Sequence, residues 1–196
     1  EATEDFQKSA AVHPLKASYR ESSMLSLYAK RVTWLGSLLG ISVVTTGILS
    51  AQADTLGSAI ALAFFIPLLI GTGGNTGNQS ATLMIRAMAT GDIREGQWVG
   101  ALVREVGIGV LLGVTMGAAS WVLGFFKGDF RIALIVSLAM IAIVVASSVL
   151  GVILPVILQR LRVDPAVASN PLIASVMDIM GLVIYFAIAR AVLAAM

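Results

Sequence analysis

Residues 132–158 read IALIVSLAMIAIVVASSVLGVILPVIL, a run without a single charged side chain. A helix of this length can cross the roughly 30 Å hydrocarbon core of a bilayer, for which about 20 residues are needed. Similar apolar runs recur along the chain, and each is expected to be a helix, because a helix satisfies its own backbone hydrogen bonds in lipid. The predicted spans cover about residues 31–51, 56–88, 98–126, 132–158 and 168–193.

The composition agrees with a membrane location. Charged residues make up 12% of the chain, hydrophobic residues 58%, and the mean hydropathy is +0.93. A soluble domain usually carries about 25% charged residues. We therefore expect an all-α integral membrane protein that contacts lipid and no nucleic acid. The sequence has no cysteine, which excludes a disulfide framework and thiolate metal sites.

The first 30 residues differ from the rest, because charged and apolar side chains alternate there. The mixture predicts an amphipathic helix on the cytoplasmic membrane surface, broken near Pro14, ahead of a pore domain at 31–196. A linker without a role is the alternative. Since the chain begins at Glu1 without a methionine or a signal peptide pattern, we expect a longer protein whose missing part is N-terminal.

Lysine and arginine predict the orientation, since cytoplasmic loops are enriched in both. If the chain crosses the membrane five times, three of these basic residues fall on one side: Lys127, Arg131 and Arg190. Ten fall on the other: Lys8, Lys16, Arg20, Lys30, Arg31, Arg86, Arg94, Arg104, Arg160 and Arg162. The protein is therefore expected in the cell membrane, that is, the inner or plasma membrane. Its N-terminus is expected in the cytoplasm and its C-terminus outside. Four or six crossings remain as alternatives.

Small residues at intervals of four suggest where helices approach closely. Gly36 and Gly40 form such a pair in the first span, and Gly109, Gly113 and Gly117 form a longer series in the third. We expect these glycines to serve packing.

One segment at membrane depth is unexpectedly polar. Residues 67–80 read PLLIGTGGNTGNQS, and each glycine costs about 1 kcal/mol relative to alanine in a helix. The segment is expected to face other helices or a wet cavity, where freed carbonyls and amides can offer oxygens to a cation. If it stays helical, Gly71, Gly74 and Asn78 share one face. A tight helix-packing seam is the alternative.

A second unusual segment, residues 164–178, reads DPAVASNPLIASVMD and places Asp178 well inside the fifth span. A carboxylate at the bilayer centre costs about 2.5–3.5 kcal/mol on insertion scales, so it needs a partner. A bound cation is the simplest one; a protonated Asp178 or a pair with Arg104 is the alternative. Asn170, Ala174, Asp178 and Gly181 form one helical stripe, which is typical of a pore wall.

The available ligands are all oxygens, which favours a hard cation. Magnesium keeps several waters, so a wide site with one aspartate per subunit suits it. Because two subunits would double the charge, and twofold dimers are the commonest oligomers, we expect a homodimer whose second and fifth spans line the pore. The further pore-lining residues predicted in these spans are Pro67, Asn75, Gln79, Pro171 and Gly181.

The two polar segments also carry a family resemblance. The run Gly73-Gly74-Asn75-Thr76-Gly77-Asn78-Gln79 within residues 67–79 and the run from Asp164 to Asp178 resemble the two motifs of MgtE magnesium channels, in the expected order. The resemblance implies a homodimeric, magnesium-selective channel in which Asp178 binds hydrated Mg²⁺. It further implies that the same site is lined by Asn170, Ala174, Gly71, Gly74 and Asn78.

Members of that family also have cytoplasmic N-terminal and CBS domains that bind magnesium and close the pore. Those domains are absent from this sequence, apart from the connecting helix at its start. The resemblance therefore suggests a candidate regulatory metal site on the cytoplasmic side, with solvated surface charges as the alternative reading. Its predicted acids are Glu1, Glu4, Asp5 and Asp164.

A secondary transporter, an enzyme and a passive assembly module are the alternative functions. An ion-coupled secondary transporter of divalent cations would also use a midplane carboxylate, but it should show an internal repeat, and five spans divide poorly into halves. Flux that needs a sodium or proton gradient would favour it. An enzyme is not expected, because intramembrane proteases need a second buried aspartate, a Ser-His pair or a His-Glu-x-x-His motif. A passive assembly module is a further alternative.

Overall fold

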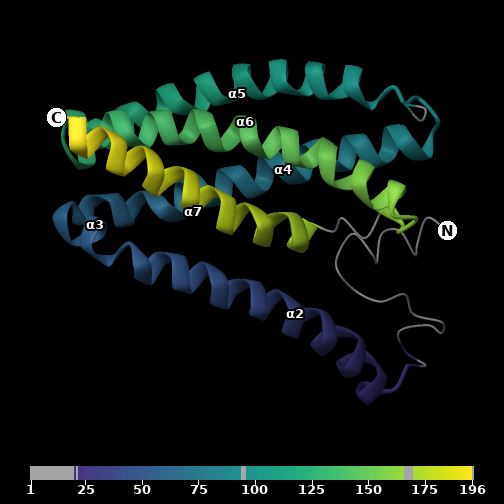
Figure 1. Ribbon diagram of the computed structural model, residues 1–196. Coiled ribbons are helices and arrows are strands. Elements are labelled where there is room, and N and C mark those ends of the chain that lie inside the picture. The colour runs from purple at the N-terminus through teal and green to yellow at the C-terminus, as the bar shows by residue number, and fades with distance from the viewer. Residues whose placement is uncertain (1–19, 21, 94–95, 166–169, 196) are drawn as a thin grey trace.

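The computed structural model describes residues 20, 22–93, 96–165 and 170–195. Every regular element in these ranges is a helix, and Figure 1 shows their arrangement. In chain order they are α2 (Met24–Ala51), α3 (Ala53–Ser58), the 3-10 helix η1 (Ile60–Phe65), α4 (Ile66–Ala89), α5 (Trp98–Lys127), α6 (Phe130–Arg160) and α7 (Asn170–Ala195).

Five of these segments are long and apolar enough to cross a membrane, counting η1 and α4 as one continuous span. The predicted number of spans and the all-α class are confirmed within the described residues. The predicted ends differ by a few residues. The first span begins earlier than residue 31, because Ser23 caps α2: its hydroxyl accepts a hydrogen bond from the Ser26 N–H at 3.2 Å. Most of the predicted surface helix at 1–30 lies outside the described residues.

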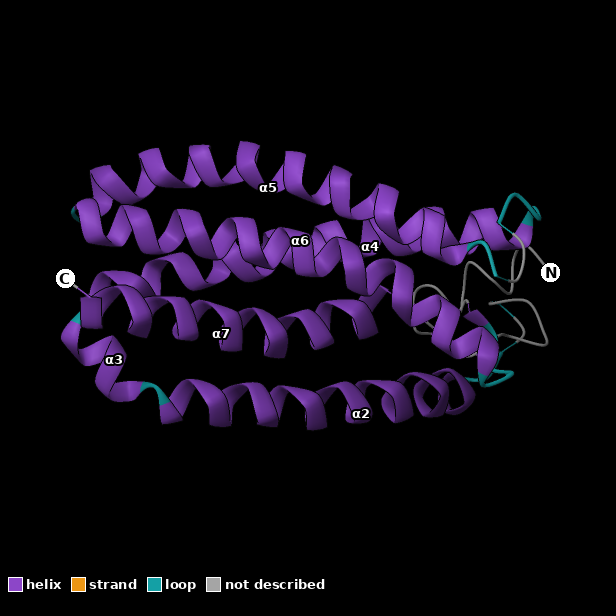
Figure 2. Ribbon diagram, turned by 45° about the horizontal axis from the view of Figure 1, so that its top comes forward, coloured by secondary structure: helices purple, strands orange, loops and turns teal. Residues whose placement is uncertain are grey.

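Helix α6 forms the centre of the bundle, with α4, α5 and α7 packed around it (Figures 1 and 2). Its sequence is apolar on every side, as expected for a helix buried among others. The core residues that α6 contributes include Ile135, Val136, Ala139, Met140, Ile143 and Val144, none of them more than 1% exposed.

Glycines allow α5 to approach α6 closely. A Cβ added at Gly117 would lie 2.7 Å from Ile141 Cγ1, and one at Gly113 would lie 3.1 Å from the Ile141 carbonyl oxygen. The predicted packing role of this glycine series is therefore confirmed. By contrast, a Cβ at Gly36 or Gly40 would meet nothing within 4 Å, so the predicted packing pair in α2 has no partner inside the subunit.

Helix α2 stands apart from the bundle. It approaches the other helices near α3 and α7 and diverges from them toward its N-terminal end (Figure 1). No residue of α2 is buried. An apolar helix with this much free surface is suited to contact with lipid or with another protein.

The second span is interrupted before its polar part. Ala59 leaves helical geometry, with φ −148° and ψ 74°, between α3 and η1. The turn that follows is held by Tyr185 of α7, whose hydroxyl donates a 2.8 Å hydrogen bond to the Leu62 carbonyl. Pro67 then stands in the first turn of α4, where its missing N–H has no intrahelical partner to lose.

Candidate functional site

The polar segment 67–80 is helical throughout, as part of α4. The expected helix is therefore confirmed here, and the expectation of freed carbonyls is wrong. The reason is tertiary packing. A Cβ at Gly73 would lie 2.7 Å from Ile143 Cγ2, and one at Gly77 would lie 2.9 Å from Ile173 Cγ2. Close packing against α6 and α7 thus offsets the poor helix propensity of these glycines.

The opposite face of α4 carries polar groups into the surroundings of the subunit. Asn75 and Gln79 are exposed, as are Pro67 and Gly71, and a Cβ at Gly71 would meet nothing within 4 Å. These residues follow one another at helical spacing, so they form a stripe along α4. The packing-seam alternative therefore describes one face of α4 and leaves this polar stripe unexplained.

Asn78 lies between the two faces and is partly buried. Its side-chain oxygen is buried and has no hydrogen-bond partner among the described residues. Beside it, an open groove of about 430 Å³ is lined by Asn78, Gln79, Thr82 and Leu83. A buried amide oxygen without a donor is uncommon, so Asn78 is an unsatisfied polar group at the edge of this groove.

Helix α7 runs antiparallel to α4 and aligns the two predicted motifs. A Cβ at Gly74 would lie 3.7 Å from Ala174 Cβ, and one at Gly181 would lie 3.7 Å from Ile70 Cγ1. Interpolation between these contacts places Gly71 about level with Asp178. Asn78 falls near the start of α7, where Asn170 is the first helical residue. The two motifs, about a hundred residues apart in the chain, therefore lie side by side.

Asp178 is partly buried on α7. Among the described residues it forms no ion pair, and in particular none with Arg104. The structurally paired alternative is therefore not supported. Within the same part of the chain, no three acidic, histidine or cysteine side chains cluster closely enough to hold a metal ion. One subunit thus supplies a single carboxylate, together with neutral oxygens on α4.

The remaining predicted pore residues of α7 are placed differently from one another. Asn170 is exposed and Pro171 is partly exposed, whereas Gly181 is buried between Ile70 and Ile143. Within the subunit, Gly181 therefore serves the close packing of α7 on α4 and α6. Its assignment as a pore-lining residue stays a prediction.

The candidate regulatory acids are not brought together by the described residues. Asp164 is exposed just after α6. Glu1, Glu4 and Asp5 lie outside the described residues, so the predicted cytoplasmic metal site stays a prediction.

A second carboxylate at membrane depth was not singled out from the sequence. Glu105, two turns into α5, accepts a 2.6 Å hydrogen bond from the hydroxyl of Ser80 on α4. Ser80 is 4% exposed and lies opposite Asn78 on the helix. The pair borders a cavity of about 250 Å³ that Arg104 also lines. The signal in the sequence was the depth of Glu105 in an apolar span, the same signal that marked Asp178.

Removing this donor should destabilise the protein. Ser80→Ala leaves the Glu105 carboxylate without its hydrogen bond, and we expect a loss of about 1.5–3 kcal/mol, the usual range for bonds to charged groups. In a double variant with Glu105→Leu, the cost should be smaller than the sum of the single costs. Thermal unfolding in detergent measures both. Strict additivity would contradict a coupling between the two side chains.

A family model described as a divalent cation transporter, MgtE, matches residues 66–188. The chain belongs to the MgtE family. The match begins at α4 and ends within α7, so it contains both the polar stripe of α4 and Asp178.

Three curated MgtE relatives are similar along nearly all of this chain. It is 42% identical over 195 residues to the protein named magnesium transporter MgtE of Thermus thermophilus. It is 33% identical over 192 residues to the protein of that name from Bacillus subtilis, and 30% identical over 190 residues to the one from Enterococcus faecalis. The alignments cover 100%, 97% and 96% of this chain but 43%, 42% and 41% of the relatives. The chain therefore spans less than half the length of these relatives.

Proposed function

We propose that this chain forms the ion-conducting part of a magnesium channel, in which Asp178 holds hydrated Mg²⁺. The observation that carries the proposal is the unpaired, partly buried carboxylate on α7 beside the exposed polar stripe of α4. A carboxylate at this depth is costly without a countercharge. A cation supplies that charge, and the amide oxygens of the neighbouring α4 stripe suit a hard ion. The names of the three relatives support magnesium as the ion.

The ion is expected to keep its water. Magnesium loses its hydration shell reluctantly and binds directly at about 2.0–2.1 Å in octahedral geometry. A single carboxylate per subunit cannot replace six waters. The carboxylate can instead accept hydrogen bonds from the waters that Mg²⁺ keeps. The site would then select ions by the size and charge of the hydrated ion. Other hydrated divalent cations of similar size are then also candidates for transport.

A second copy of the chain completes the site in this proposal. The polar stripe of α4 faces outward from the subunit, and lipid cannot satisfy its amides. A twofold axis beside the stripe would bring two stripes and two Asp178 side chains around one aqueous path. The remaining apolar surfaces, including those of α2, would contact membrane lipid.

The distribution of lysine and arginine supports an orientation with the N-terminus in the cytoplasm of the cell membrane. In the structure, Arg86, Arg160 and Arg162 lie at or just after the ends of α4 and α6, and Lys127 ends α5. The uptake direction, from outside toward the Arg-rich end, follows from an inside-negative membrane potential.

The absence of cysteine from the sequence offers a direct test. Asn75→Cys places a single thiol on the α4 stripe, and we expect a water-soluble, charged thiol reagent to label it and an oxidant to link two subunits. Labelling should slow when Mg²⁺ is present. Val114→Cys on α5, whose valine is 54% exposed, is the matched control and should react only with membrane-soluble reagents. Equal behaviour of the two variants would overturn the assignment of the stripe to a pore.

A further inference from the structure

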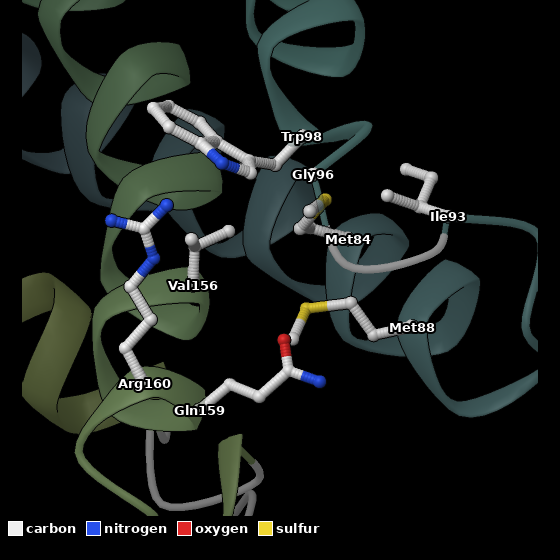
Figure 3. Close-up of a pocket in the computed structure, with 8 residues that line it drawn as sticks. All are labelled: Met84, Met88, Ile93, Gly96, Trp98, Val156, Gln159 and Arg160. Carbon is white, nitrogen blue, oxygen red and sulfur yellow. The ribbon is translucent and has the colours of Figure 1, made fainter.

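A cavity of about 310 Å³ opens at the end of the bundle where α4 and α6 finish and α5 begins, away from the α4 stripe (Figure 3). Its volume falls at the lower end of the range typical of ligand pockets. Its lining residues are Met84, Met88, Ile93, Gly96, Trp98, Val156, Gln159 and Arg160. We propose that this cavity binds an anionic phospholipid, with the phosphate on Arg160 and an acyl segment against the methionines.

The lining changes from apolar to polar along the membrane normal. Met84 and Val156 lie one turn deeper than Met88 and Arg160 on their helices, a rise of about 6 Å at 1.5 Å per residue. Arg160 is the last residue of α6 and Trp98 the first of α5, so both fall at the level of the headgroups if these helices are centred in the bilayer. The cavity thus matches an amphiphile, with its polar end at the surface.

Arg160 is already oriented for a phosphate. Its guanidinium carbon lies 5.2 Å from the centre of the Trp98 ring (Figure 3). Stacking uses the face of the guanidinium and leaves its edge N–H groups available, which suits bidentate binding of phosphate oxygens. Among the described residues, the structure shows no hydrogen bond or ion pair to Arg160. Gln159, the neighbouring residue, also lines the cavity and places its amide beside Met88 (Figure 3).

The charge of the cavity lining favours an anionic lipid over a neutral one. Exposed basic and acidic side chains both surround this end of the bundle, among them Arg162, Asp92 and Asp164, whereas the charged side chain in the lining is that of Arg160. Negatively charged lipids are attracted to basic groups at a cytoplasmic surface, so the preference is expected to depend on Arg160. A free phosphate would use Arg160 but would leave the apolar depth of the cavity empty. An amphiphile uses both.

The test compares lipids on the full-length protein by native mass spectrometry after delipidation. Wild type should retain phosphatidylglycerol in preference to phosphatidylcholine. Arg160→Gln should weaken phosphatidylglycerol binding by about tenfold, which is the loss of one charge-assisted contact, with phosphatidylcholine unaffected. Arg162→Gln is the matched control, because Arg162 lies two residues away but does not line the cavity, and it should bind as wild type does.

A second variant separates a lipid from a soluble anion. Met88→Trp narrows the apolar side of the cavity above Met84 while leaving Arg160 in place, so it should weaken phosphatidylglycerol binding as well. Competition by millimolar inorganic phosphate with no effect of Met88→Trp would overturn the proposal in favour of a phosphate site. The wild type could also bind no lipid, with binding appearing only after residues 1–19 are deleted. That result would overturn the proposed lipid site in favour of the chain's own N-terminal acids. Binding is measured without transport, so this outcome is independent of the proposed channel function.

Discussion

Asp178→Ala is expected to reduce Mg²⁺ uptake to background while the protein still folds and dimerises. In the proposed dimer, the variant removes a carboxylate from each of two subunits. Contacts between a charged group and its hydrogen-bond donors contribute about 1.5–3 kcal/mol each, so the loss of two should lower the affinity of the site roughly a hundredfold or more. Growth rescue of a magnesium-dependent strain and uptake into proteoliposomes both measure the effect.

Asp178→Asn refines this expectation, because it keeps the shape and removes only the charge. Mg²⁺ should then block monovalent flux more weakly than in the wild type. Asp54→Asn is the matched control: its exposed carboxylate on α3 lies outside the site, and the variant should conduct normally. Normal Mg²⁺ uptake by Asp178→Ala would refute the assignment of Asp178 as the ion-binding carboxylate.

Gly151→Val is expected to disrupt the bundle at the junction of α4 and α6. A Cβ at Gly151 would lie 2.5 Å from Ser80 Cβ, 2.7 Å from the Gly77 carbonyl oxygen and 2.9 Å from the Ala81 nitrogen. Two of these atoms belong to the backbone of α4, which cannot turn aside as a side chain can. Overpacking a core typically costs about 1–3 kcal/mol, and we expect Gly151→Ala to reach that range and Gly151→Val to exceed it.

The measurement is thermal stability in detergent, followed by the fraction of monodisperse protein after heating. Gly107→Ala is the control, because a Cβ there would meet nothing within 4 Å and the residue lies in the neighbouring helix α5. That variant should be as stable as the wild type or slightly more so. If Gly151→Ala unfolds at the same temperature as Gly107→Ala, α4 and α6 do not pack as closely as the structure has them.

The spans could be predicted from the sequence because they depend on local properties. The length and the lack of charge of a run such as residues 132–158 can be read from the sequence without knowing which helices pack against it. The break at Ala59 could not be predicted in this way. It depends on the hydrogen bond from Tyr185 to Leu62, which joins residues 123 positions apart.

The candidate site shows the same division. Asp178 was predicted from depth alone, since a carboxylate in an apolar span is anomalous wherever it points. The roles of the α4 residues could not be separated in advance: Gly73 and Asn75 are both plausible in a polar motif, yet only α6 and α7 decide that the first is buried and the second exposed. Ser80, likewise, becomes the partner of Glu105 only once α4 and α5 are placed.

The central claim, that a hydrated divalent ion neutralises the carboxylates within the membrane, has one decisive measurement. A structure of the full-length protein in lipid, soaked with Mn²⁺ as an anomalous scatterer, locates the ion directly. We expect a peak on the axis between two Asp178 side chains, farther from their oxygens than a direct bond of about 2.1 Å. An empty axis, with each Asp178 packed against apolar neighbours and the metal elsewhere, would contradict it.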